Sequence, residues 1–351
     1  MSKIVLDAFG GDHAPKEVVA GVAMAMERGF VQPEQVLLTG PAEAVRAELA
    51  AQGLPVDKIA VHDAPDVLTC DDSPTDAMRK KPRNSIAVGV QLVKEGAAGG
   101  FVSAGSTGTV VAAATLGLRC LEGIRRPAIG AIIHGEKQPF LVLDVGANPQ
   151  PKPLHLAHYA LMGSAYYAGT FGVSKPRVGV LNIGSEELKG NPLVREARGL
   201  MKQLPISFHG NVEGVEVFTG DCHVIVADGF TGNVLLKVSE GVAEYLVRHM
   251  AGLMKKVGVA PEHQKVILGE TMHRIDFSEY GGALLLGVEG IVTICHGRSR
   301  APAFANAIRF ALRALDQKVN EHIVEAVRSV QLPAAGASDD TGSPSGARSG
   351  G

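Results

Sequence analysis

The sequence GFVSAGSTGTV at residues 100–110 contains the unit from which we expect the whole fold to be built. Its first four residues are a short apolar run that predicts a buried strand, and the glycines that follow predict a tight turn opening a helix. The unit returns at residues 223–234 as HVIVADGFTGNV, and both turns read G-x-T-G-x-V. Repeated units of strand, turn and helix build parallel sheets that are covered by helices.

The same alternation extends along most of the chain and predicts its fold class. Short apolar runs alternate with segments of helical periodicity, which favours a three-layer α/β/α protein with a mostly parallel sheet. One helix is expected over residues 301–329. The expected strands are residues 3–7, 35–39, 58–62, 100–103, 128–133, 140–145, 177–183, 215–219, 223–227 and 290–294.

The C-terminal segment differs in composition from the rest of the chain. Residues 333–351 are rich in Gly, Ser, Ala and Pro and lack the apolar side chains needed to offset the entropy of ordering. We therefore expect one domain over residues 1–332, followed by a disordered tail.

Composition and charge narrow the function classes. The 34 basic and 36 acidic side chains nearly cancel, so no overall positive field is available to hold a nucleic acid. The four cysteines form no C-x-x-C pair, which argues against a disulfide framework or a structural zinc site. A strand-like run directly follows the first residues, and no apolar run approaches the roughly 18 residues of a membrane span. We expect a soluble cytoplasmic protein with at most peripheral membrane contact.

The two G-x-T-G-x-V turns are candidate anion sites. Glycines let backbone N–H groups approach an anion, hydroxyl groups donate to it, and the positive end of a helix dipole attracts it. The alternative is that the glycines only permit tight turns. The candidate ligand-binding residues are Gly105, Ser106, Thr107, Gly108, Gly229, Thr231, Gly232 and Asn233.

The turn after the first strand contains two further candidates. Asp12 and His13 lie between a pair of glycines and Pro15, where a helix is expected to begin. His13 is the side-chain type that titrates near neutrality, so it could orient phosphate or protonate a leaving group. Alternatively, Asp12 only caps the helix and His13 lies on the surface.

Two later strand ends provide polar candidates. Asp144 and Asn148 follow a buried strand and could bind a polar part of a ligand, or they could only satisfy the loop backbone. Lys189 lies in another strand-end loop and is a candidate cation for phosphate, although most loop lysines are simply solvated.

Other patterns carry weaker signals. His155 and His158 are three residues apart on an expected helix face, but no further ligand is identifiable, so we expect no metal and no cofactor. Neither a G-x-S-x-G motif nor an activated cysteine indicates covalent catalysis. Residues 242–256 have an apolar stripe opposite a basic side, which fits an interfacial helix or a helix packed on a core or dimer partner.

Taken together, the motifs resemble the bacterial acyl-acyl carrier protein:phosphate acyltransferases, the PlsX family. They occur in the family's order and span the chain to about residue 332. The matching segments are VLDAFGGDHAP at 5–15, SAGSTG at 103–108, LDVGAN at 143–148, GSEELKGN at 184–191, DGFTGN at 228–233 and YGGA at 280–283.

The resemblance implies a fold related to phosphotransacetylases and to isocitrate/isopropylmalate dehydrogenases. It implies the conversion of acyl-acyl carrier protein and inorganic phosphate to acyl phosphate and free carrier protein, for phospholipid biosynthesis. It also implies a homodimer, peripheral contact with the inner face of the cell membrane, and a downstream glycerol-3-phosphate acyltransferase. The main catalytic residues would be Lys189 and Asp228.

The sequence departs from the family pattern at three places. Phe9 and Ser106 replace the family's usual Met and Asn, and residues 250–280, where the family's membrane-touching helices lie, are partly polar.

Direct displacement is the expected mechanism, because holding two reactants in line and stabilising an oxyanion suffices for a thioester and phosphate. The two glycine turns would hold phosphate, and Lys189 would neutralise the negative charge that develops on the carbonyl oxygen. Asp228 would orient Lys189 or a phosphate proton, and His13 would protonate the leaving sulfur.

The basic segment at residues 79–83 is a candidate surface for the acidic carrier protein.

Three alternatives remain: two other enzyme classes and a non-catalytic membrane-associated scaffold, in which the strand-end motifs would be purely structural. A phosphotransacetylase that uses acyl-coenzyme A would share the fold and the chemistry and differ in the thioester carrier. A nicotinamide-dependent dehydrogenase is disfavoured, because no G-x-G-x-x-G follows a strand with the expected acidic residue downstream.

Overall fold

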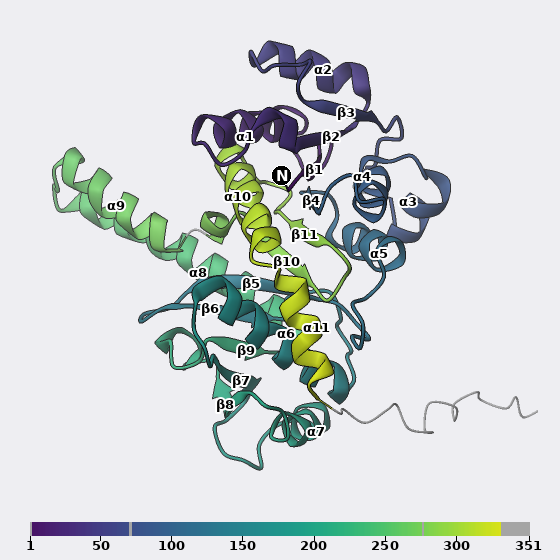
Figure 1. Cartoon of the computed structure of the whole chain (residues 1–351). Helices are drawn as coiled ribbons and strands as arrows, with labels where there is room; N and C mark the ends of the chain where they lie inside the picture. Colours follow the sequence, from purple (N-terminus) through teal and green to yellow (C-terminus); the bar gives the residue numbers. More distant parts are fainter. Residues whose placement is uncertain (1, 70–71, 276, 331–351) are drawn as a thin grey trace, which may run out of the picture.

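The computed structural model describes residues 2–69, 72–275 and 277–330. The expected C-terminal tail lies outside the described residues. The described chain forms an eleven-stranded sheet in the order β3-β2-β1-β4-β11-β10-β5-β6-β9-β7-β8, with helices on both faces (Figure 1). This confirms the expected α/β/α architecture. The strands are β1 (Ile4–Asp7), β2 (Val36–Gly40), β3 (Ala60–Asp63), β4 (Gly100–Ser103), β5 (Ala128–His134), β6 (Pro139–Leu143), β7 (Arg177–Asn182), β8 (Ser207–Glu213), β9 (Val224–Val226), β10 (Ala283–Leu286) and β11 (Ile291–Ile294).

The sheet contains two parallel sets of strands that run in opposite directions. β3, β2, β1, β4 and β11 pair in parallel, and so do β6, β9, β7 and β8. Between the sets, β10 is antiparallel to β11 and β5, and β5 is antiparallel to β6. Through β11, β10, β5 and β6, the register places Val102 of β4 level with Val226 of β9. The turns after β4 and β9, which contain the repeated motif, therefore begin at nearly the same level of the sheet although the two strands run in opposite directions.

Helices cover both faces of the sheet. One face carries α1, α6, α10 and α11, and the other carries α4 and α5. The helices are α1 (Lys16–Glu27), α2 (Ala42–Ala51), α3 (Pro74–Lys80), α4 (Ser85–Lys94), α5 (Thr107–Gly117), α6 (Pro153–Phe171), α7 (Pro192–Met201), α8 (Gly229–Lys256), α9 (Pro261–Ile275), α10 (Ala301–Asp316) and α11 (Val319–Arg328), with short 3-10 turns η1 (Pro33–Gln35), η2 (Val217–Thr219) and η3 (Phe277–Tyr280).

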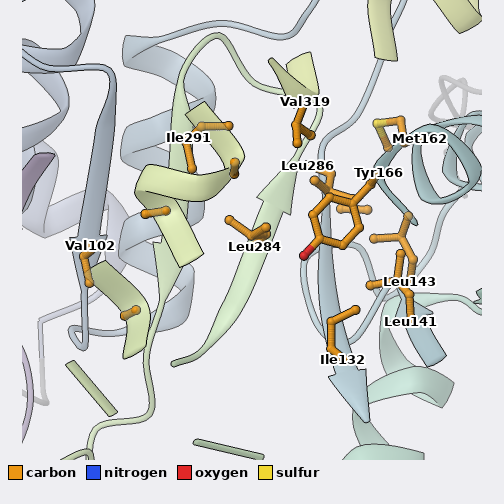
Figure 2. Packing of buried hydrophobic residues seen from close by; sticks show 14 of the residues in the cluster. Val102, Ile132, Leu141, Leu143, Met162, Tyr166, Leu284, Leu286, Ile291 and Val319 are labelled. Carbon is orange, nitrogen blue, oxygen red and sulfur yellow. The ribbon is translucent and has the colours of Figure 1, made fainter. Parts of the chain in front are cut away.

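The core is divided by the sheet because successive side chains of a strand point to opposite faces. Ile4 and Leu6 of β1 belong to one buried cluster, whereas Val5 between them belongs to the other. Both clusters are apolar, which explains why the central strands read as continuous apolar runs. Figure 2 shows part of the first cluster, where side chains of β6 and β10 lie beside Tyr166 of α6.

The helices α8 and α9 extend away from the body as a long arm, at the left of Figure 1. Exposed apolar side chains follow α8 at helical spacing, among them Val238, Val242 and Leu246. Within the described ranges, no helix combines the length and apolar content needed to cross a bilayer.

Three details of the strand prediction were wrong. Residues 215–219 form a turn and the 3-10 helix η2 (Val217–Thr219) instead of a strand. Val217 is buried, whereas Phe218 is 40% exposed. The strand β8 was missed because its sequence, SFHGNVE, is mostly polar, as an edge strand allows. The strand β10 was missed because it is a four-residue run that directly follows a glycine pair.

The single helix expected over residues 301–329 is also wrong, because two helices occupy this segment. The helix α10 ends at Asp316, and Lys318 then adopts a left-handed conformation with φ 51° before α11 begins. The apolar periodicity continues across the break because both helices bury one face against the same side of the sheet.

Gly232 in the first turn of α8 provides a test of this packing. A Cβ atom at Gly232 would lie 1.9 Å from the carbonyl oxygen of Asp144, whereas one at Gly241 of the same helix would meet nothing within 4 Å. We expect Gly232→Ala to lower the free energy of unfolding by about 3 kcal/mol through overpacking. Gly241→Ala should raise it by about 0.5 to 1 kcal/mol through helix propensity. Urea unfolding of both variants measures the difference, and equal effects would contradict the close approach.

Candidate functional site

A cavity of about 730 Å³ opens where the loops after β1, β4 and β11 meet the first turns of α8. Gly11 makes this meeting possible. Its φ of 97° suits glycine, and a Cβ atom there would lie 3.0 Å from the oxygen of Gly297 and 3.1 Å from the Cβ of Ala104. The Asp12 backbone N–H also donates to the oxygen of Gly297 at 2.8 Å. The three loops are therefore in direct contact.

Asp7 lies beneath these loops and lines the cavity although it is only 1% exposed. Its Oδ2 accepts from the Ser103 hydroxyl at 2.7 Å, and the Ser103 oxygen accepts from the Gly105 backbone N–H at 3.0 Å. Burial raises the pKa of the Asp7 carboxyl, and the hydrogen bonds from Ser85 and Ser103 oppose that shift. Sequence reasoning missed Asp7 as a site residue, although an acidic residue that ends an apolar strand was a usable signal.

The first turn of α5 is a favourable place for an anion. Gly105, Ser106 and Thr107 line the cavity, and the Ser106 side chain makes no capping hydrogen bond. No side chain therefore caps the backbone N–H groups of this turn. These groups and the positive end of the helix dipole can both attract an anion. Gly108 is not among the cavity-lining residues, and a Cβ atom there would lie 3.1 Å from Pro74.

The matching turn at the start of α8 is built differently. The carboxylate of Asp228 accepts from the backbone N–H groups of Phe230 and Thr231 at 3.1 and 2.9 Å and from the Thr231 hydroxyl at 2.6 Å. A Cβ atom at Gly229 would lie 2.8 Å from the Asn148 backbone. This helix start is therefore already capped, and of its candidate residues only Asn233 lines the cavity.

Asp144 and Asn148 organise the loop after β6. The fully buried Asp144 carboxylate accepts from the backbone N–H groups of Ile129, Gly146, Ala147 and Asn148, and burial raises its pKa. The Asn148 amide donates to the Pro127 oxygen at 2.6 Å. These bonds match the loop-satisfying alternative, and substrate binding by either residue stays a prediction.

The three predicted catalytic residues do not line this cavity. Lys189 is exposed on the loop after β7, and Asp228 is the helix cap described above. His13 is partly exposed, whereas its neighbour Asp12 does line the cavity. Asp12 is not a helix cap, because α1 begins at Lys16 with Pro15 as its N-cap and no capping side chain. The roles of Lys189, Asp228 and His13 stay predictions.

Three cavity-lining residues were not singled out from the sequence. Lys237 and Glu240 lie on α8 and form an ion pair at 2.8 Å, and His296 follows β11. His296 comes two residues after an expected strand, so the rule that ligands bind at strand ends could have found it. Lys237 lies two turns inside a helix and belongs to no motif.

The two histidines on α6 have different surroundings. The Nδ1 of His155 accepts from the Lys152 backbone N–H at 3.1 Å. Burial lowers the pKa of His158 to about 4, which is consistent with a neutral core histidine. In the part of the chain that the structure describes, no group of three potential metal ligands occurs.

Sequence comparisons connect the chain with known proteins. A family model described as fatty acid synthesis protein matches residues 2–322. A phosphate acyltransferase from Pelotomaculum thermopropionicum is 42% identical over 95% of this chain and 97% of its own length. One from Heliobacterium modesticaldum is 43% identical over 93% and 99%.

Solved structures with a similar fold are distant in sequence. A phosphotransacetylase from Streptococcus pyogenes superimposes with a TM-score of 0.63 at 19% identity, over 90% of this chain and 94% of that chain. A putative 4-hydroxythreonine-4-phosphate dehydrogenase from Salmonella typhimurium reaches 0.54 at 13% identity, over 89% and 99%. This likeness confirms the phosphotransacetylase-related fold and shows the fold alone.

The buried Asp7 predicts a specific dependence of stability on pH. Because its pKa is raised in the folded state, the folded protein binds this proton more tightly than the unfolded chain does. The contribution of Asp7 to stability is therefore present at low pH and is lost as the pH rises through the folded pKa. We expect the free energy of unfolding of the wild type, relative to Asp7→Asn, to fall as the pH rises above 3.8. Urea unfolding at a series of pH values measures this difference, and a constant or rising value would contradict it.

Proposed function

Because the chain belongs to the fatty acid synthesis protein family, and its relatives at 42% and 43% identity are phosphate acyltransferases, we propose that its substrates are acyl-acyl carrier protein and inorganic phosphate. The products are then acyl phosphate and free carrier protein, for use in phospholipid biosynthesis. No metal or cofactor is needed for this reaction, because a phosphate oxygen attacks the thioester carbonyl directly.

The observation that supports the proposal most strongly is the first turn of α5. This turn has no capping side chain, and it lines a cavity with both polar and apolar side chains. Its N–H groups and the hydroxyls of Ser106 and Thr107 can donate to phosphate oxygens. Lys237 adds a cation to the same cavity, where it is paired with Glu240. Apolar side chains elsewhere in the lining can contact an acyl chain or the pantetheine arm. They are Leu68, Ile86, Ile129, Val145, Leu236 and Ile294.

The proposed chemistry requires a charge-stabilising group beside the attacked carbonyl. As phosphate adds, negative charge gathers on the carbonyl oxygen, and the carbon–sulfur bond then breaks. Lys189 would neutralise that charge, with Asp228 orienting Lys189 or a phosphate proton, and His13 would protonate the sulfur. Since Lys189 lies on an exposed loop, its action requires this loop to reach the bound substrate.

The proposed partners follow from the substrate and the surface. A homodimer and peripheral contact with the inner face of the cell membrane would use the exposed apolar side chains of the α8–α9 arm. A downstream glycerol-3-phosphate acyltransferase would consume the acyl phosphate in the cytoplasm.

The basic segment at residues 79–83 is a weaker docking candidate than its sequence indicated. Arg79 and Lys80 pair with Asp76, Lys81 pairs with Asp72, and Arg83 pairs with Asp63. These carboxylates offset much of the positive field that an acidic carrier protein would meet. Docking of the carrier protein there stays a prediction.

The decisive experiment separates the two thioester carriers. Purified protein is mixed with phosphate and either palmitoyl-acyl carrier protein or palmitoyl-coenzyme A, and free thiol and hydroxylamine-trappable acyl phosphate are followed. We expect phosphate-dependent release from the carrier protein. Release from coenzyme A alone would instead support a phosphotransacetylase, and no release from either would overturn the proposal.

Lys189 can be tested with the same assay. If it stabilises the transition state, Lys189→Ala should lower kcat by about 10² to 10³, the cost of one lost oxyanion donor. The matched control is Lys175→Ala, which changes another exposed lysine outside the cavity walls and should leave kcat unchanged. An undiminished kcat in the Lys189 variant would remove this residue from the mechanism.

A further inference from the structure

We propose that His296 is a catalytic residue whose Nε2–H donates a hydrogen bond to the carbonyl oxygen as the acyl group passes to phosphate. This inference rests on the proposed function and adds to it a donor that no family motif quoted above contains. This role is supported by the position of His296, by the hydrogen bond on its other ring nitrogen and by the charges around it.

His296 lies at the junction of the three loops that line the cavity. It lines the cavity, and the next residue, Gly297, accepts the backbone N–H of Asp12 at 2.8 Å. Gly297 also lies against Gly11, which in turn touches Ala104, the residue before the α5 turn. His296 is thus held next to the loop that would bind phosphate, where the attacked carbonyl must also lie.

The hydrogen bond on the other nitrogen determines which ring nitrogen can donate. The Nδ1 of His296 accepts from the Arg298 backbone N–H at 3.1 Å. A nitrogen that accepts a hydrogen bond carries no proton, so the neutral ring carries its proton on Nε2. The loop therefore selects the tautomer with a donor on the nitrogen that the backbone does not use.

The surroundings of His296 favour its neutral form. Burial lowers its pKa, and the cations Lys237 and Arg298 act in the same direction, whereas Glu240 and Asp12 oppose them. A neutral imidazole can donate a hydrogen bond to an oxyanion, but loss of its only proton would leave a costly imidazolate. This limits His296 to stabilising charge and leaves protonation of the sulfur to another group.

The reaction step is balanced without a change of protonation at His296. A phosphate oxygen forms a bond to the carbonyl carbon, and the electron pair of the carbonyl moves onto its oxygen, where the Nε2–H hydrogen bond becomes stronger. When the carbonyl re-forms, the carbon–sulfur bond breaks and the sulfur leaves with the electron pair as a thiolate. Lys237 lies in the same cavity, where the carboxylate of Glu240 pairs with it at 2.8 Å.

Two substitutions distinguish a donor at Nε2 from a structural role. Glutamine places an amide N–H near the position of Nε2, whereas asparagine reaches only the position of Nδ1. We expect His296→Asn to lower kcat by about 10² to 10³ with the KM for phosphate nearly unchanged. His296→Gln should keep at least ten times more activity than His296→Asn, and the control His209→Asn, on the exposed edge strand β8, should behave as the wild type.

Outcomes of this comparison either support the inference or overturn it. Full kcat in His296→Asn, equal losses in the two variants, or a loss expressed only in KM would overturn it. A wild type that releases no thiol from palmitoyl-acyl carrier protein would instead refute the proposed function, so the two failures are distinguishable.

A second measurement is independent of activity. The ¹⁵N chemical shifts of histidine-labelled wild-type protein report which ring nitrogen carries the proton, and His296→Gln identifies the resonances of His296. We expect a protonated Nε2 and an unprotonated Nδ1 near neutral pH. The opposite tautomer, or a doubly protonated ring, would overturn the inference.

Discussion

The hydrogen bonds that join Asp7, Ser103 and Gly105 are the interaction on which the candidate site depends. They connect the end of β1 to the end of β4 and to the α5 turn, so one buried carboxylate holds two loops in register. The contact of Gly11 with Gly297 and Ala104 adds the loop after β11. The three loops belong to strands of one parallel set, which explains why their ends meet on one side of the sheet.

The two copies of the G-x-T-G-x-V motif show how one side chain changes the chemistry of a turn. The residue before the first glycine is Ala104 in one copy and Asp228 in the other. Asp228 occupies the helix N–H groups that Ala104 leaves without a side-chain partner. The repeated letters predicted two equivalent anion sites, and the preceding residue makes them unequal.

Most of the fold was predictable from the sequence, and the candidate site only in part. Apolar runs identified the buried strands, but strand direction is invisible to periodicity, so the reversal at β10 and β5 was not predicted. Asp12 and the α5 turn were found because they directly follow strands. Lys237 was not, because it reaches the cavity only through the course of a long helix.

The 28-residue helix α8 also has a mechanical consequence. Its first turn is fixed by the Asp228 cap and by the contact of Gly232 with Asp144, whereas its far end projects beyond the body. At 1.5 Å per residue, Lys237 lies about 8 Å from this anchored turn and Lys256 about 36 Å from it. A rigid tilt about the anchor therefore displaces the outer end about four to five times as far as the cavity wall. If the arm tilts as a rigid body, a large excursion of its tip reaches the cavity only as a small displacement of the wall that Lys237 forms.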